Sequence, residues 1–114
     1  MQPVDLARFI VDVSSEKQAS DIVLLDVKKS CDFADYFVIM SADSARQTSA
    51  LIREIDGELK KKDVRRYRLE GDSKSGWVVA DYGDVLVHIF GPEERDFYDL
   101  EHVWDGAVEV VRIQ

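Results

Sequence analysis

Cysteine, histidine and proline are scarce in this chain of 114 residues, which has one Cys, two His and two Pro. The lone Cys31 excludes an internal disulfide framework and suits a reducing compartment. His88 and His102 lack the spacing of a zinc motif, and His88 is either a hydrogen-bonded surface residue or a ligand. The sequence therefore predicts no disulfide, no metal site and no cofactor.

Long hydrophobic runs are also absent. No stretch approaches the ~20 apolar residues that a membrane-spanning helix needs. The first residues, Met-Gln-Pro-Val-Asp, lack the basic and apolar regions of a secretory signal peptide. With 46% hydrophobic and 33% charged residues, the sequence predicts one soluble, cytoplasmic domain over residues 1–114, large enough to build a single core.

The motifs of common enzyme classes are missing as well. The chain has no G-x-S-x-G turn, no Walker A loop and no G-x-G-x-x-G loop. Nucleotidyl transfer needs two carboxylates two residues apart on one strand face, but a lysine follows Asp26 at that spacing, and Asp81 and Asp84 are separated by a turn. Ser41-Ala42 stands where a phosphate-binding Gly-Ser pair would be needed. We predict that the chain is not an enzyme.

What the sequence does contain is a hairpin pattern. Two runs of six residues, Trp77–Tyr82 and Val85–Phe90, flank Gly83-Asp84. A glycine in a two-residue link between β-branched runs predicts a tight turn, because such turns need positive φ. The predicted register places three apolar pairs on one face, which we expect to lie on the core: Tyr82 with Val85, Ala80 with Val87, and Val78 with Ile89.

The other face of the hairpin is mixed. It pairs Asp81 with Leu86, Val79 with His88, and Trp77 with Phe90. Such a face is either covered by a second layer or forms a wet contact surface for a partner. Since little sequence remains to cover it, we expect Trp77, Asp81 and His88 to be accessible.

Helical and extended patterns alternate along the rest of the chain. Helices are predicted from Pro3 to about Val13, from near Ser44 to about Lys62, from Pro92, and as a last short helix capped by Asp99. Strands are predicted at residues 22–27, 36–40, 67–70, 77–82 and 85–90. This order predicts an α/β fold, with a mixed five-stranded sheet and helices packed mainly on one face.

The C-terminal part allows two further predictions. Phe97, Leu100 and Trp104 are expected in the core rather than on the surface. The tail Ala107–Gln114 either adds a short strand or packs across the surface.

Charge is unevenly distributed. Residues 1–68 are balanced, whereas residues 69–114 hold three basic and eleven acidic residues and so carry the whole net charge of −8. This field favours a basic partner, although a solubilising surface is the alternative. Five basic residues near the end of the second helix are interpreted as a solvated face or as a peripheral RNA contact: Lys60, Lys61, Lys62, Arg65 and Arg66.

An ordered set of short motifs resembles the ribosomal silencing factor family, the bacterial and organellar relatives of the maize iojap protein. The resemblance spans about Leu6 to Trp104. Its most specific parts are the hairpin from Trp77 to His88 and the pattern Arg-x-Phe-Tyr-x-Leu-Glu-x-x-Trp that begins at Arg95. The other matching segments are Asp26-Val27, Asp35–Ile39, Ser41–Gln47, Glu70-Gly71 and Ile89-Phe90.

The resemblance implies a nucleotidyltransferase-like fold without that activity. It also implies binding to the large ribosomal subunit through its protein numbered fourteen, a block to joining of the small subunit, slower translation under starvation, and a homodimer when free. A divergent metal-dependent nucleotidyltransferase and an RNA-binding module are the alternatives.

Eight residues are the predicted contacts with the ribosomal protein. We expect Trp77, Tyr82 and Tyr98 to act as aromatic anchors and His88 to set their geometry. Glu70, Asp81, Asp84 and Glu101 are expected to supply complementary charge.

Overall fold

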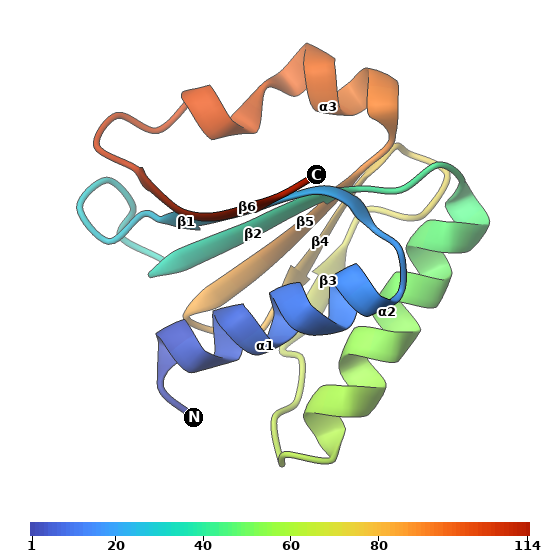
Figure 1. Ribbon diagram of the computed structural model, residues 1–114, viewed down its shortest axis with the longest axis horizontal. Helices are drawn as coiled ribbons and strands as arrows, with labels where there is room; N and C mark the ends of the chain where they lie inside the picture. Colours follow the sequence, from blue (N-terminus) through green and yellow to red (C-terminus); the bar gives the residue numbers. More distant parts are fainter.

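The computed structural model describes residues 1–114 as three α-helices and one six-stranded sheet. Figure 1 shows the sheet as a central layer between the helices. The elements in chain order are α1 (Pro3–Glu16), β1 (Ser20–Asp26), β2 (Tyr36–Ser41), α2 (Ala45–Lys60), β3 (Arg68–Glu70), β4 (Trp77–Asp81), β5 (Val85–Phe90), α3 (Pro92–Tyr98), the 3-10 turn η1 (Leu100–His102) and β6 (Val108–Ile113). No helix combines the length and the apolar character that crossing a membrane requires.

The sheet is mixed, as the sequence predicts, but it has six strands rather than five. Its order is β3-β4-β5-β2-β1-β6, and β2 and β5 are parallel while all other neighbours are antiparallel. The sixth strand comes from the tail, for which a strand was one of two alternatives. Pairing with β1 satisfies backbone groups that would otherwise leave β1 as an open edge.

The hairpin of β4 and β5 has the predicted register. Trp77 lies opposite Phe90, and Asp81 lies opposite Leu86. Gly83 adopts a φ of 90°, a conformation that favours glycine, and the N–H of Tyr82 donates to the carbonyl of Val85 across the turn. The alternation of side chains along both strands therefore assigns each residue to the expected face.

The two long helices α1 and α2 cover one face of the sheet, which we call the first face (Figure 1). α1 runs to Glu16, beyond the expected end, and Ser14 in its last turn is buried with its hydroxyl donating to the carbonyl of Ile10. α2 begins after Ser44, whose side chain accepts the N–H of Gln47 as an N-cap. A cluster of 19 buried residues fills this layer, and each fully buried aliphatic side chain contributes roughly 1.5–3 kcal/mol.

The opposite side, which we call the second face, is covered by the segment 92–107, so the expectation that it lacks a cover is wrong. Leu100 is buried against it, as predicted, and Trp104 is half-buried. Phe97 is 81% exposed instead of buried. The physical reason is that α3 turns Arg95 inward, and two residues further along a helix point to nearly the opposite side.

Candidate partner-binding surface

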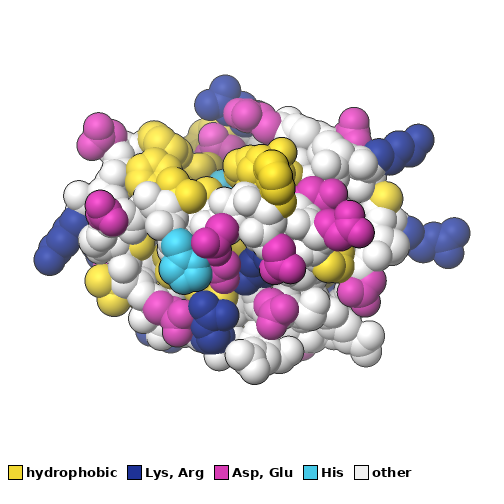
Figure 2. All heavy atoms as spheres, turned by 90° about the horizontal axis from the view of Figure 1, so that it is seen from above, with side chains coloured by type: hydrophobic (Ala, Val, Ile, Leu, Met, Phe, Trp, Pro, Cys, Tyr) yellow, Lys and Arg dark blue, Asp and Glu magenta, His cyan; other side chains and the backbone are white.

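Aromatic side chains gather on the second face. The ring of Trp77 lies 4.6 Å from that of Tyr98, and Tyr98 lies 5.0 Å from Phe97. Phe33 and Trp104 form a neighbouring pair at 6.0 Å. Figure 2, which looks onto this side of the molecule, shows the hydrophobic side chains in two groups bordered by acidic ones. We call these five residues the aromatic surface.

Trp77 is held in place from several directions. Its indole Nε1 donates to Nδ1 of His88 at 3.2 Å, and its ring stacks on Phe90 at 5.0 Å with 30° between the planes. It is half-buried, so part of it stays open to solvent. A large side chain fixed in one orientation loses little entropy when a partner packs on it, which suits an interface anchor.

His88 lies beneath this surface and is only 5% exposed, so the expectation that it is accessible is wrong. Because Nδ1 accepts from Trp77, the neutral ring carries its proton on Nε2. Nε2 is buried and has no hydrogen-bond partner, and the Phe37 ring lies 4.7 Å away at 62°. Burial lowers the pKa of His88 to about 3, so the imidazole is neutral at physiological pH and orients Trp77.

A hollow of about 360 Å³ opens beside His88 on the second face. It brings together three of the predicted residues, Glu70, Asp81 and His88. The other lining residues are Phe33, Arg68, Val79 and Leu86. Arg68 Nε lies 3.4 Å from Glu70 and 3.5 Å from Asp81, so two carboxylates share one guanidinium and the rim stays negative.

Tyr82 lies on the first face, away from the aromatic surface. It is 4% exposed, and its hydroxyl donates to Asp56, which also pairs with Arg66 at 2.7 Å. Burial, followed by the hydrogen bond to Asp56, raises the pKa of Tyr82. As a surface anchor Tyr82 is therefore misassigned, because strand alternation points it to the core.

Asp84 and Glu101 are also separate from the aromatic surface. Asp84 lies in the turn at the far end of the hairpin from Trp77. Glu101 accepts from Arg95 Nη2 at 2.7 Å, and Arg95 Nη1 donates to the hydroxyl of Ser41 at 2.8 Å. This buried network ties η1 and α3 to β2, so Glu101 holds the cover segment in place.

Sequence reasoning missed Phe33 as a surface aromatic and misplaced Phe97 in the core. Phe33 is 63% exposed and falls in the connection between β1 and β2, where no periodic pattern marks a contact residue. Phe97 directly precedes the predicted anchor Tyr98, which is 44% exposed. Its position next to Tyr98 was the only feature of the sequence that could have indicated Phe97 as a surface residue.

The five basic residues lie at the opposite end of the molecule from α3, around the end of α2 (Figure 1). Three of them are engaged: Lys61 pairs with Glu58 at 2.7 Å, Arg66 pairs with Asp56, and the ammonium of Lys62 lies 4.8 Å from the Phe9 ring centroid. These contacts favour the interpretation of a solvated face.

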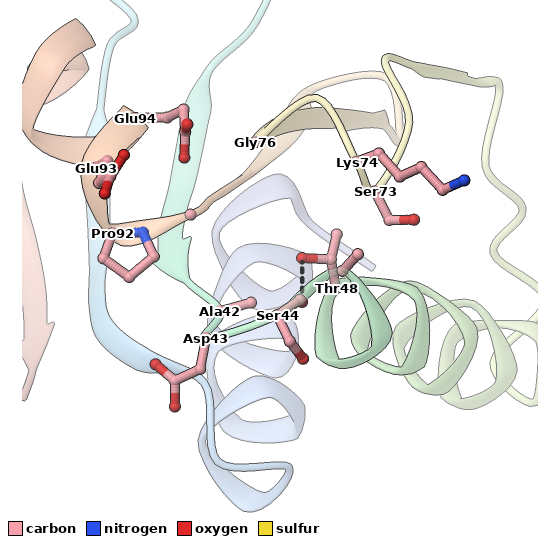
Figure 3. A pocket seen from close by; sticks show the side chains of 12 residues that line it. Ala42, Asp43, Ser44, Thr48, Ser73, Lys74, Gly76, Pro92, Glu93 and Glu94 are labelled. Carbon is pink, nitrogen blue, oxygen red and sulfur yellow. Dashed lines mark hydrogen bonds between the residues drawn. The ribbon is translucent and has the colours of Figure 1, made fainter.

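A second hollow, of about 370 Å³, lies at the N-terminus of α2 (Figure 3). It lies at the helix start where nucleotidyl transfer would need a phosphate-binding Gly-Ser pair, but Asp43, Glu93 and Glu94 line it against a single cation, Lys74. Such an excess of carboxylates repels phosphate. No group of three or more His, Cys, Asp or Glu side chains is arranged to hold a metal ion.

Comparison with known proteins gives consistent results. A family model described as "Ribosomal silencing factor during starvation" matches residues 1–114. Ribosomal silencing factor RsfS of Bacillus subtilis (strain 168) is 34% identical over 107 residues, which cover 94% of this chain and 91% of that protein. Protein Iojap, chloroplastic, of Zea mays is 35% identical over 105 residues, covering 89% of this chain and 44% of that protein.

Solved structures agree with the fold. A crystal structure of a Chromobacterium violaceum protein superposes with a TM-score of 0.86 at 31% identity and covers 93% of this chain and 88% of that chain. A crystal structure from Bacillus halodurans superposes with a TM-score of 0.79 at 33% identity, covering 94% and 99%. With the family match over its whole length, the chain belongs to the ribosomal silencing factor family.

Proposed function

We propose that this chain is a translational repressor that binds the large ribosomal subunit through its basic protein numbered fourteen and blocks joining of the small subunit under starvation. The observation that carries the proposal is the aromatic surface with its acidic border (Figure 2). Family membership supplies the ribosome as the partner class.

Affinity in this proposal comes from the aromatic side chains. Trp and Tyr are enriched among interface residues that dominate binding, especially where they are packed in one orientation. The rings of Trp77 and Tyr98 contact each other with centroids 4.6 Å apart and 45° between their planes, and His88 holds the indole through a hydrogen bond. Phe97 and Phe33 extend the contact area on either side.

In this proposal, charge determines the rate of association with the partner and the orientation in which the partner binds. Residues 69–114 carry the whole net charge of −8, and an acidic field steers a basic protein toward its docking surface. Glu70 and Asp81 outnumber Arg68 at the hollow beside His88 and accept hydrogen bonds from basic or amide side chains of the partner. Asp84 adds to the field from the turn, and Glu101 contributes by holding the cover segment.

The proposal has further parts, which rest on the sequence and on the resemblance to the family. The chain acts in the cytoplasm, without catalysis and without a membrane. It adopts a nucleotidyltransferase-like fold as a single domain over residues 1–114. It forms a homodimer when free, and any RNA contact is peripheral, made by the basic residues around the end of α2.

Sedimentation with separated ribosomal subunits tests the proposal. The purified chain is mixed with large or small subunits at moderate salt and followed through a gradient. We expect comigration with the large subunit alone. Binding to neither subunit contradicts the proposal, and titration with divalent metal and with naked RNA at several salt concentrations then tests the enzymatic and RNA-binding alternatives.

A further inference from the structure

β3 and β4 bring two carboxylates and one arginine together at the edge of the second face. Arg68 lies opposite Asp81, and Glu70 lies opposite Val79. Because alternate residues of a strand point to the same side, these three charged residues share the side of the sheet that carries His88. All three line the hollow of about 360 Å³ beside His88. The hollow therefore contains a cationic group of the chain itself.

The contacts of Arg68 are longer than those of other arginines in the chain. Its Nε lies 3.4 Å from Glu70 and 3.5 Å from Asp81. Arg66 and Arg95, by contrast, each approach a carboxylate to 2.7 Å. The Arg68 side chain is 68% exposed, and exposed ion pairs contribute little to stability because water screens both charges. Arg68 can therefore leave the hollow at small cost.

Asp81 is held in place more firmly than Arg68. Its Oδ1 accepts the backbone N–H of Gly83 at 2.8 Å in the turn of the hairpin, and its side chain is only 22% exposed. Its other oxygen, Oδ2, is the one that faces Arg68. A carboxylate that is fixed and only partly solvated attracts a cation more strongly than a mobile, fully solvated one. Departure of Arg68 leaves this oxygen without a positively charged partner.

The other walls of the hollow suit a guanidinium group better than an ammonium group. Phe33 lines the hollow and is 63% exposed, and guanidinium groups stack on aromatic rings. Val79 and Leu86 offer apolar surface to the methylene groups of a long side chain. The imidazole of His88 is neutral at physiological pH and adds no positive charge. The chemistry of the hollow thus matches an arginine side chain.

We propose that Arg68 is an internal competitor of the partner: it occupies Glu70 and Asp81 in the free chain and is displaced when an arginine side chain of the basic partner enters the hollow. The inference rests on the proposed function, because the hollow belongs to the same docking surface. The displacement needs only a rotation of the Arg68 side chain, since backbone groups alone form the ladder between β3 and β4. Removing the charge of Arg68 therefore strengthens binding, although it takes a charged residue out of the interface.

Arg68→Met tests the competition, because methionine keeps an apolar stem and removes the charge. We expect Arg68→Met to bind the large subunit about threefold more tightly than the wild type in quantitative sedimentation. Lys74→Met is the matched control. It changes the net charge equally, but Lys74 lines the hollow at the N-terminus of α2, so its variant binds like the wild type.

Two results of this comparison overturn the competition and leave the proposed function standing. One is unchanged or weaker binding of Arg68→Met while the wild type binds the large subunit. The other is an equal gain in Lys74→Met, which would assign the effect to net charge.

A double-mutant cycle tests whether the gain depends on the two carboxylates. Glu70→Gln combined with Asp81→Asn removes both charges, and asparagine keeps an oxygen that accepts the N–H of Gly83. We expect this background to bind the large subunit more weakly than the wild type. Adding Arg68→Met to it gives no gain, because there is no carboxylate left to compete for. The same gain in both backgrounds would contradict the inference.

A probe that needs no ribosome separates the inference from the proposed function. N-acetyl-arginine amide is titrated into the free chain, and the backbone amide signals of Val79 and Asp81 are followed by NMR. We expect saturable shifts, with half-saturation at a lower concentration in Arg68→Met than in the wild type, and smaller shifts with N-acetyl-lysine amide. Even if the wild type bound neither ribosomal subunit, this titration would decide the inference. Absence of any shift in Arg68→Met with the arginine probe would overturn it.

Discussion

The two faces of the sheet are built differently. Under α1 and α2, the first face is a layer of 19 buried residues, and its side chains come mainly from the two helices and from β1, β2, β4 and β5. The second face buries ten hydrophobic residues and with them the polar groups of His88, Ser41 and Arg95. Its aromatic side chains contact one another in tilted and edge-to-face arrangements and are partly exposed. We therefore expect the first face to supply most of the stability, and the second face is the proposed partner-binding surface.

The largest expected effect is on the first face. Leu24 is fully buried at the centre of β1, and Leu24→Ala removes its packing and leaves a cavity. We expect the free energy of unfolding to fall by about 2–5 kcal/mol in chemical denaturation. Below the transition, binding to the large subunit is unchanged. A loss of binding in the folded variant would mean that the two faces are not independent.

On the second face we expect the opposite result, since Trp77→Ala should affect binding to the large subunit more than stability. The variant loses a fixed, partly exposed anchor, and we expect binding to the large subunit to weaken by at least about 2 kcal/mol, or roughly thirtyfold. Tyr67→Ala is the matched control, since Tyr67 is 77% exposed and packs at Gly83, beyond the far end of β4 from Trp77. If Trp77→Ala and Tyr67→Ala bound the large subunit with equal affinity, Trp77 would not be part of the interface.

Acid destabilises the second face through His88. Burial lowers the pKa of His88 in the folded state to about 3, against an ordinary value of 6.5, so protonation favours the unfolded chain. The contribution of neutral His88 to the free energy of unfolding is fully present above pH 6.5. It decreases by up to about 1.4 kcal/mol per pH unit as the pH drops toward 3. Chemical denaturation at pH 7 and pH 5 measures how much the free energy of unfolding decreases between these two pH values. We expect this decrease to be about 2 kcal/mol smaller in His88→Gln than in the wild type. An equal decrease in both proteins would show that His88 does not contribute to it.

The smallest expected effect concerns Tyr82. Tyr82→Phe removes the hydroxyl that donates to Asp56, which keeps its pair with Arg66. We expect the free energy of unfolding to decrease by about 1–2 kcal/mol, with unchanged ribosome binding. If Tyr82→Phe impaired binding instead, the original assignment of Tyr82 as an anchor would be correct.

The first face was predictable because its signals are local. The alternation of Val85, Val87 and Ile89 and the turn at Gly83 determine the hairpin register without knowledge of the rest of the chain. The helical spacing in residues 3–16 and the N-cap at Ser44 similarly depend on neighbours in sequence.

The second face could not be predicted in the same way, because its cover depends on contacts between distant segments. Arg95 is a charged residue in a short helix, and only its pairing with Glu101 and Ser41 permits its burial. That inward turn exposes Phe97, while the rings of Phe37, Trp77 and Phe90, which come from three different strands, surround His88. The tail was ambiguous because the bulge at Val110 interrupts its alternation.

The most direct test of the account is a subunit-joining assay with the aromatic surface intact or removed. Separated subunits are combined with increasing amounts of the wild-type chain, Trp77→Ala or Tyr67→Ala, and joined ribosomes are measured by gradient centrifugation. We predict that the wild type and Tyr67→Ala prevent joining in proportion to their binding to the large subunit, while Trp77→Ala prevents it only at much higher concentration. Full joining in the presence of bound wild-type chain, or equal inhibition by Trp77→Ala, would contradict the account.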